Sequence, residues 1–516
     1  MTPRSWRSLY WPLVAATTVA CVMFVQSISL PHVLVVAVLG VFAPLGMAWL
    51  GGRLTHEVEP HATQAAGKGW TFPWFAVALF CLACVKFCVL GSLSSGFLPA
   101  VHDEWSYLFG AQTMAQGRFA NPTPPHPEFF DAFHILATPQ WVTRYWPGHP
   151  VVLALGVLAG WPPSVVIALC AGTAVWIYLL GRELGGEAVG KLAGLLAILA
   201  PGLDFVASGF LSQSTFLFAI TGCYACTIRS LRCASIGWAA AAGALGGWAI
   251  LTRPYSAVAM GLPLAFWFIG QTCQRIWRSH AQSDAEPEME AGSSNSDATE
   301  RSTSTDSPLA RFGILVVATF LPLLACLGFF AMYNLATTGS PLRTAWMEYN
   351  REFEPDNTLG FSSGVAHPIR PKLNARKLVK AQSIAGEKLA FTWKKALRRA
   401  FADPRRVSEM VFPAVGFYGL IALVPFGRRR RVENVQSARL WWLIVAGVAS
   451  HYVAYSFFYS TWSVYGHETI PLVLILVAAG CVEFWRQGRD SDRPGIAAVV
   501  PLVLMAALAV DGREVG

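Results

Sequence analysis

Charged residues are scarce in this chain. They make up 13% of its 516 residues, about half the share of an average soluble domain, whereas 54% of the residues are hydrophobic. One globular core does not absorb that much apolar surface. Because stretches of nearly twenty apolar residues recur from end to end, the sequence indicates a polytopic, all-α membrane protein. The stretches lack polar residues at every second position, which excludes a membrane β-barrel.

Cysteine is missing from the two long segments between apolar stretches, 93–162 and 335–408. All eleven cysteines lie in or beside the apolar stretches. Disulfide bonds therefore do not hold the two long segments together. Cys81, Cys84 and Cys88 fall within one apolar helix and are expected to be small packing residues rather than metal ligands.

Thirteen stretches are long and apolar enough to cross a membrane: 9–29, 32–50, 71–92, 163–181, 189–207, 212–228, 235–252, 255–272, 311–334, 409–426, 438–458, 467–485 and 495–511. A fourteenth, 151–160, is too short for a hydrocarbon layer of about 30 Å and is expected to dip into the surface. The first stretch has no small-residue cleavage site, so no cleaved signal peptide is expected.

Lys and Arg residues gather in alternate connections, which predicts a cytoplasmic N-terminus and places both long segments outside. The same distribution favours a bacterial inner membrane as the location. The second long segment has fourteen Lys or Arg against six Asp or Glu. A segment longer than about 60 residues is exempt from the charge bias. Its basic cluster, 370–406, either attracts an anionic lipid or forms a solvated face.

Composition divides the chain into four regions. Residues 279–310 hold seven acidic residues and eight serines, and are expected to be a disordered cytoplasmic linker. The linker separates a catalytic core at 71–278 from a C-terminal membrane region at 311–516. Residues 1–70 add two further spans and a cytoplasmic loop.

The first long segment begins with an acidic pair. Asp103 and Glu104 follow an apolar helix by about ten residues and open an amphipathic stretch, with Tyr107 and Leu108 among its apolar positions. Capping of a helix explains such acids without any function. The segment continues with NPTPPHPEFF and RYWPGHP, so acids, an Arg, prolines and aromatics would enclose a polar pocket for a phosphate head group at the membrane surface.

Four motifs carry a family resemblance: DEWSYLFGAQTMAQGRF, RYWPGHPVVLALG, LTRPYSAVAMGLPL and YNLATTGSPLRTAWMEY. Because these motifs occur in this order, the chain resembles the GT-C integral-membrane glycosyltransferases. The resemblance is strongest to the branch of protein O-mannosyltransferases and lipid A aminoarabinose transferases (glycosyltransferase family 39-like). The resemblance implies inverting transfer of a sugar from a polyprenyl-phosphate carrier to an acceptor hydroxyl on the outer face.

Site residues follow from the same resemblance. The family's base matches Asp103, with Glu104 beside it to position acceptor or metal. Arg144 matches a cation that holds the donor phosphate. The related branch has another Arg three residues after the base, where this chain has Ser106, so that phosphate contact is not carried over. Desolvation and the neighbouring carboxylate are expected to raise the pKa of Asp103 and make it a better base.

Other polar residues complete the predicted site. Arg253 and Tyr333 are assigned to the donor phosphate, although Arg253 is equally explained by snorkelling to head groups. The substrate pocket is predicted to contain His102, Tyr107, Tyr145, His149, His467 and Glu468. Histidines at 102, 126, 134, 149, 367 and 467 would face outward, so a divalent cation is possible, but no HxH or HExxH spacing supports a metal site.

Two other interpretations stay open from the sequence. A transporter or flippase of a lipid-linked sugar would show paired halves and charges at mid-membrane; Lys86 is the main such charge and can snorkel outward. A non-catalytic scaffold would tolerate loss of the acidic pair. The expected partners are a polyprenyl-phosphate-linked sugar, a lipid, glycan or protein acceptor, and membrane lipids, with no nucleic acid.

Overall fold

The computed structural model describes residues 74–283, 308–362, 364–368, 374–402, 435–460 and 463–490. The stretches predicted at 9–29, 32–50, 409–426 and 495–511 lie outside the described residues, as does most of the predicted linker. The boundaries of the four regions therefore stay predictions.

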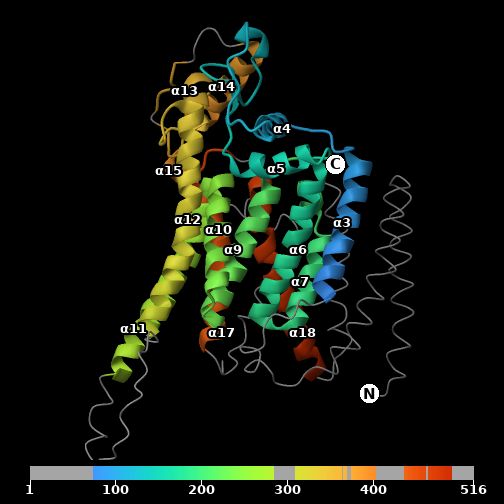
Figure 1. Ribbon diagram of the computed structural model, residues 1–516, viewed down its shortest axis with the longest axis vertical. Coiled ribbons are helices and arrows are strands. Elements are labelled where there is room, and N and C mark those ends of the chain that lie inside the picture. The colour runs from blue at the N-terminus through green and yellow to red at the C-terminus, as the bar shows by residue number, and fades with distance from the viewer. Residues whose placement is uncertain are drawn as a thin grey trace, which may run out of the picture. The chain divides into compact units, whose positions relative to one another are not determined.

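Helices dominate the described chain (Figure 1). In chain order they are α3 (Trp74–Ser94), α4 (His102–Ala115), the short 3-10 helix η1 (Pro127–Phe130), α5 (Gly148–Leu158), α6 (Pro163–Gly185), α7 (Glu187–Leu199), α8 (Pro201–Ala207), α9 (Gln213–Cys233), α10 (Ile236–Thr252), α11 (Pro254–Ser283), α12 (Pro308–Thr338), α13 (Ala345–Phe353), α14 (Ala375–Leu389), α15 (Trp393–Phe401), α17 (Val435–Ser456), the 3-10 helix η3 (Ser463–Thr469) and α18 (Ile470–Asp490). One small antiparallel hairpin pairs β1 (Ile135–Leu136) with β2 (Val142–Thr143).

Five described helical stretches are long and apolar enough to span a membrane: α3, α6, the Pro254–Gln274 part of α11, the Gly313–Thr338 part of α12, and Val464–Glu483. Helices α7 and α8 together would make a sixth. The all-α polytopic architecture is confirmed, but the predicted count of thirteen spans is not. Helix α10 has only 17 residues, and α9 begins with QST and carries Arg229 and Arg232 near its end, so both are poorer spans than their sequence positions suggested.

The core of the bundle is built around α6, which packs against α3, α7, α9 and α18. Glycines let α6 and α7 approach closely. A Cβ atom added at Gly190 would lie 2.7 Å from the carbonyl oxygen of Tyr178, so a larger residue there would push the helices apart. The two ends of this bundle differ, because the connections at one end carry α4, the hairpin and the helices of the second long segment (Figure 1).

A buried ion pair lies at the break between α7 and α8. The two helices meet at an angle of 58°, where Pro201 cannot continue α7. Lys86 of α3 donates to the carbonyl oxygen of Ile198, which the break leaves without a helical partner, and pairs with Asp204 in the first turn of α8. Lys86 therefore does not snorkel as the sequence suggested, since its side chain is buried against the break.

Replacing Lys86 by Met is expected to destabilise the bundle by about 1–3 kcal/mol, because Asp204 and the Ile198 carbonyl would lose a charged donor. Fluorescence-detected thermal unfolding in detergent measures the effect. The double variant Lys86→Met/Asp204→Asn should melt at a higher temperature than Lys86→Met. Equal melting of the wild-type protein and Lys86→Met would show that the pair does not hold the break.

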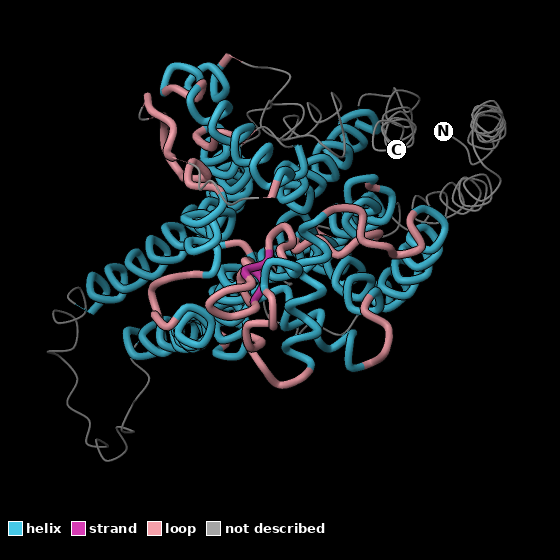
Figure 2. Tube along the Cα trace, turned by 90° about the horizontal axis from the view of Figure 1, so that it is seen from above, coloured by secondary structure: helices cyan, strands magenta, loops and turns pink. Residues whose placement is uncertain are grey.

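The second long segment contributes α13, α14 and α15, and each helix begins with a side-chain cap. The side chains of Thr344, Asn374 and Thr392 accept hydrogen bonds from backbone N–H groups three residues ahead. Figure 2 shows the hairpin strands in magenta, surrounded by pink loops and cyan helices. The caps explain why a polar, basic segment forms regular helices at all.

The basic cluster does not form a uniformly solvated face. Lys377 pairs with Asp131 of the first long segment. Lys388 donates to the carbonyl oxygens of Thr358 and Gly360, at 2.7 Å each. Several cations of the second long segment thus turn inward and fasten it to the chain around it.

Candidate active site

The site begins at α4, whose two faces have different surroundings. Ser106, Tyr107, Gly110 and Ala111 lie on the buried face, toward the hairpin and α5. A Cβ atom at Gly110 would come within 2.8 Å of the Thr143 side chain, so the glycine lets α4 lie directly on β2. Asp103, in the first turn, is held at the edge of this contact with 24% of its side chain exposed.

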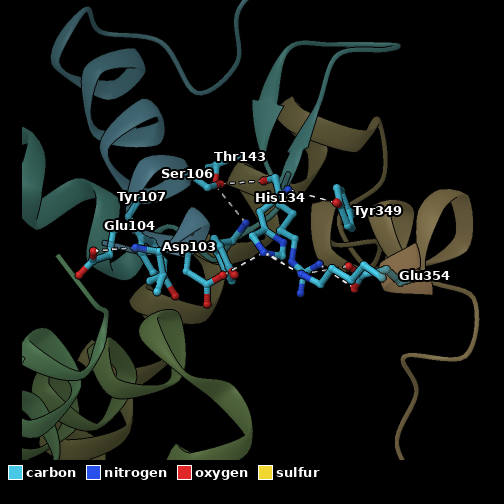
Figure 3. A network of polar contacts seen from close by, with 12 residues as sticks. Asp103, Glu104, Ser106, Tyr107, His134, Thr143, Tyr349 and Glu354 are labelled. Carbon is cyan, nitrogen blue, oxygen red and sulfur yellow. Dashed lines mark hydrogen bonds and ion pairs between the residues drawn. The ribbon is translucent and has the colours of Figure 1, made fainter. Parts of the chain in front are cut away.

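Asp103 faces His134, which lies just before β1 (Figure 3). Asp103 Oδ1 is 2.9 Å from His134 Nε2, and the Tyr145 hydroxyl is among the groups that lower the pKa of Asp103. His134 itself is buried. The loop after α4 thus brings His134 and Tyr145 to one partly exposed carboxylate.

Every polar group of the His134 backbone is engaged. Its N–H donates to the Tyr349 hydroxyl at 3.1 Å. Its carbonyl oxygen accepts from Ser106 Oγ at 2.7 Å and from the Arg144 N–H at 3.0 Å. His134 also has a φ of 62°, a left-handed conformation that a non-glycine residue adopts only where its surroundings fix it. Ser106, where the related branch has Arg, therefore holds the partner of Asp103 in place.

Arg144 lies in a closed cage behind this pair. Its Nη1 is 2.9 Å from Glu354 Oε2, and its guanidinium lies 3.9 Å from the centre of the Trp346 ring and 4.7 Å from that of Tyr349. Only 5% of its side chain is exposed. Glu354 neutralises Arg144, and aromatic rings cover it. We therefore interpret Arg144 as a fixed charge that lowers the pKa of Asp103 without direct contact.

Glu354 is the centre of a second set of contacts. Asn357 Nδ2 donates to Glu354 Oε2 at 2.8 Å, and Tyr459 donates to Asn357 Oδ1 at 2.9 Å. Lys380 Nζ of α14 lies 3.5 Å from Glu354 Oε1 and 3.0 Å from His134 Nε2. The first and second long segments therefore meet at Asp103 through alternating charges.

These charges overturn the expected pKa of Asp103. Burial alone would raise the pKa, but the hydrogen bond and charge of His134, the charge of Arg144 and the Tyr145 hydroxyl together hold it well below its usual range. Burial and the cation of Arg144 lower the pKa of His134 to about 4. At neutral pH Asp103 is thus an anion, and His134 is a neutral imidazole whose Nε2 lies 2.9 Å from Asp103 Oδ1.

The predicted catalytic part of Glu104 is not supported by its geometry. Its Oε1 accepts from the Phe210 N–H at 2.7 Å, and its Oε2 accepts from the N–H groups of Ala100 and Val101 at 2.6 and 3.3 Å. Figure 3 shows its carboxylate turned away from Asp103. Burial raises the pKa of Glu104 while the three backbone donors oppose that rise. Glu104 therefore fastens the start of α4 to the turn before α9, and it contacts neither Asp103's partners nor open solvent.

Arg253 occupies a neighbouring polar layer. Its Nε is 2.6 Å from Glu468 Oε1, and its Nη1 donates to Ser212 Oγ at 2.9 Å. His451 Nε2 lies 3.0 Å from the other oxygen of Glu468. The layer joins the Asp103 site through Tyr107, which donates to Ser212 Oγ at 2.9 Å and stacks on Tyr145 with ring centres 4.3 Å apart.

The layer around Arg253 lies close to the Asp103 site because α5 and α10 are in contact. A Cβ atom at Gly148 would meet Thr252 Oγ1 at 2.4 Å, and Trp248 Nε1 donates to the Gly148 carbonyl at 3.1 Å. The GHP and LTRP motifs, a hundred residues apart in sequence, are therefore adjacent. Arg253 is an ion-pair partner of Glu468 rather than a snorkelling residue.

The remaining predicted residues divide into buried and peripheral ones. His149 is fully buried between Thr215 Oγ1, at 2.7 Å, and the Phe210 carbonyl, at 2.8 Å. Tyr333 is buried and donates to the Tyr145 carbonyl at 3.3 Å. His467 packs against Phe205. None of these three presents an open contact for substrate, so we interpret them as supports.

His102 lies in a groove apart from Asp103 and His134. With Trp105, Phe109 and Phe133 it lines a groove of about 420 Å³ on the face of α4 away from Tyr107. In the described parts of the chain, no three His, Cys, Asp or Glu side chains gather into a group that would hold a metal ion. A divalent ion at Asp103 would thus have few protein ligands beyond that one carboxylate.

Sequence reasoning missed several residues of the site. The sequence indicates His134 only as one of six outward histidines, and it does not indicate Glu354, Trp346, Tyr349 or Lys380. The first long segment offered a signal for His134, an isolated His in an aromatic stretch between the acid and the Arg. The other four lie more than two hundred residues from Asp103, where no spacing rule connects them.

Comparison with known proteins now bears on the fold. The chain matches no protein-family model and none of the curated proteins. Among solved structures it is similar to the Archaeoglobus fulgidus oligosaccharyltransferase in complex with zinc and sulfate, with a TM-score of 0.50, 12% identity, and coverage of 85% of this chain and 52% of that chain. The chain has a GT-C fold.

Two further solved structures have lower TM-scores. The apo form of the archaeal enzyme has a TM-score of 0.49 and 12% identity over 86% of this chain and 56% of that chain. ArnT from Cupriavidus metallidurans bound to undecaprenyl phosphate has a TM-score of 0.44 and 15% identity over 83% and 63%. The chain spans little more than half the length of the archaeal enzyme, and identities this low show the GT-C fold alone.

The fastening function of Glu104 gives a direct prediction. In Glu104→Gln one backbone N–H would face an amide NH₂ instead of an oxygen, so the free energy of unfolding should fall by about 1–3 kcal/mol. Thermal unfolding in detergent measures this loss. Any activity measured well below the melting temperature should stay within about tenfold of wild type. Unchanged stability together with lost activity would instead make Glu104 a catalytic group.

Proposed function

We propose that the protein is a glycosyltransferase that moves a sugar from a polyprenyl-phosphate carrier to an acceptor hydroxyl on the outer face of a membrane. The observation that carries the proposal is the ionised, partly exposed carboxylate of Asp103, held by His134 and Tyr145 at the end of a GT-C bundle. Arg144 and Lys380 supply positive charge beside it.

The reaction forms a bond from the acceptor oxygen to the anomeric carbon and breaks the bond from that carbon to the phosphate oxygen. The phosphate leaves with the electron pair, and the acceptor proton passes to Asp103. A carboxylate with a low pKa is a weak base for a free alcohol. The hydroxyl becomes acidic as its oxygen bonds to the sugar, so Asp103 takes the proton late in the step and the proton need not be removed beforehand.

His134 and Arg144 keep Asp103 ready for this step. With its proton on Nε2, His134 would hold Asp103 Oδ1 beside the acceptor hydroxyl. Arg144 keeps the carboxylate ionised, but its cage leaves little room for the phosphate contact assigned from the sequence. We therefore propose that Arg144 acts on the donor electrostatically rather than by a bidentate hydrogen bond.

Removing the base tests the proposal. Asp103→Asn should lower release of polyprenyl phosphate from a labelled donor by about 10²- to 10⁴-fold, because the amide cannot accept the acceptor proton. Reconstituted protein, a labelled polyprenyl-phosphate sugar and an outer-leaflet acceptor supply the assay. Matched melting temperatures for the two proteins serve as the control.

The alternatives predict different outcomes in that assay. Labelled sugar that crosses a sealed vesicle still attached to its carrier would favour a transporter or flippase. A protein that neither cleaves nor moves the donor would favour a scaffold. Full turnover by Asp103→Asn would remove Asp103 from the mechanism.

The fall of the transfer rate at acid pH should follow the protonation of His134. Its pKa near 4 lies below the value of about 6.5 for an unfolded His, so the rate should hold from pH 7 to about 5 and fall as the pH drops through about 4. The groups that face His134 are Asp103, Arg144 and Lys380.

The free energy of unfolding should also fall at acid pH. The unfolded chain binds more protons at this His than the folded one between pH 6.5 and 4, so stability decreases as the pH falls through that range. His134→Gln keeps an amide donor for Asp103 and should lose the acid limb. A limb near pH 6.5 in the wild-type protein would contradict the buried, neutral His134.

A further inference from the structure

One imidazole nitrogen has two competing partners in the site. His134 Nε2 lies 2.9 Å from Asp103 Oδ1 and 3.0 Å from Lys380 Nζ. A neutral imidazole nitrogen either donates its proton or accepts one, so it serves Asp103 or Lys380 but not both. A protonated Nε2 satisfies Asp103 and leaves the ammonium of Lys380 against an N–H group that it cannot use.

Lys380 is also the most exposed cation of the cluster. Its side chain is 35% exposed, compared with 5% for Arg144. Its contact with Glu354 Oε1 is 3.5 Å long, whereas Arg144 lies 2.9 Å from the other oxygen of that carboxylate. Burial lowers the pKa of Lys380 and Glu354 opposes that change. Lys380 is thus a cation with a flexible stem and no exclusive partner.

Charge balance indicates what would draw Lys380 away. Asp103 and Glu354 compensate Arg144 and Lys380, so a phosphate entering beside Asp103 would bring an uncompensated negative charge. Arg144 is already paired and covered by Trp346. A Lys ammonium is a compact charge with three rotatable donors, and it can turn toward a new anion without disturbing the backbone of α14.

We propose that Lys380 binds the phosphate of the lipid carrier and that phosphate binding withdraws Lys380 from His134. The Nε2 proton of His134 is then committed to Asp103 alone. Donor occupancy would in this way complete the orientation of the base before the acceptor reacts. This inference rests on the proposed function, because it names the group that recognises the donor at the same site.

A binding experiment tests Lys380 without turnover. Farnesyl phosphate serves as a short carrier, farnesol as the same chain without charge, and inorganic phosphate as the free anion. Lys380→Met should bind farnesyl phosphate about tenfold more weakly, or worse, than the wild-type protein and bind farnesol unchanged. Lys395→Met, which removes an exposed lysine of α15 in the same segment, should bind both ligands as the wild type does.

Nitrogen NMR of the histidine ring supplies a readout that a purely structural lysine would not move. Adding farnesyl phosphate to the wild-type protein should shift the His134 Nε2–H signal toward a stronger hydrogen bond. Lys380→Met should show the shifted signal before any ligand is added. If inorganic phosphate alone gives the same shift, the site recognises the anion rather than the lipid-linked form.

Several outcomes would overturn the inference alone. Equal affinity of Lys380→Met and wild type for farnesyl phosphate, with sugar transfer intact in the wild type, removes Lys380 from donor binding and leaves the proposed function standing. A wild-type protein that binds no farnesyl phosphate and transfers no sugar would defeat the proposed function itself. Lys380→Gln repeats the test if the Met variant melts at a lower temperature than the wild type.

Discussion

The ion-pair cluster around Asp103 joins the first and second long segments of the chain. The contact of Asp103 with His134 is local to the first long segment. The pair of Arg144 with Glu354 then crosses to the second long segment. Four charges of alternating sign sit partly out of water, and such a cluster is stable only when each charge has a partner in place. The cluster therefore links α13 and α14 to the first long segment.

The same cluster determines what kind of base Asp103 is. A carboxylate in an apolar pocket would have a raised pKa and would hold its proton at neutral pH. Here the donors around Asp103 outweigh burial, so the carboxylate is ionised throughout the physiological range. That favours a reaction in which the sugar–phosphate bond is well broken before the acceptor proton moves. In the proposed transfer, the cations beside the phosphate would therefore matter more than the strength of the base.

The sequence predicted the helical membrane class and the GT-C resemblance, and both are confirmed. The functions assigned to Asp103, Arg144, Tyr107 and Tyr145 stay predictions, although the structure places Asp103 near Arg144 and Tyr145. The raised pKa that the sequence predicted for Asp103 is wrong, because His134 and Arg144 outweigh the effect of burial. The sequence did not predict Glu354 or Lys380, since only tertiary packing places α13 and α14 over α4.

The stereochemistry of the product tests the central claim most directly. If Asp103 is a base, the acceptor attacks the anomeric carbon opposite the phosphate in one displacement, and the product has the configuration opposite to that of the donor. Proton NMR of the glycosidic product made by the wild-type protein from a donor of known configuration measures this. The account predicts inversion. Retention would mean a covalent sugar–enzyme intermediate, with Asp103 as nucleophile, and would contradict the account.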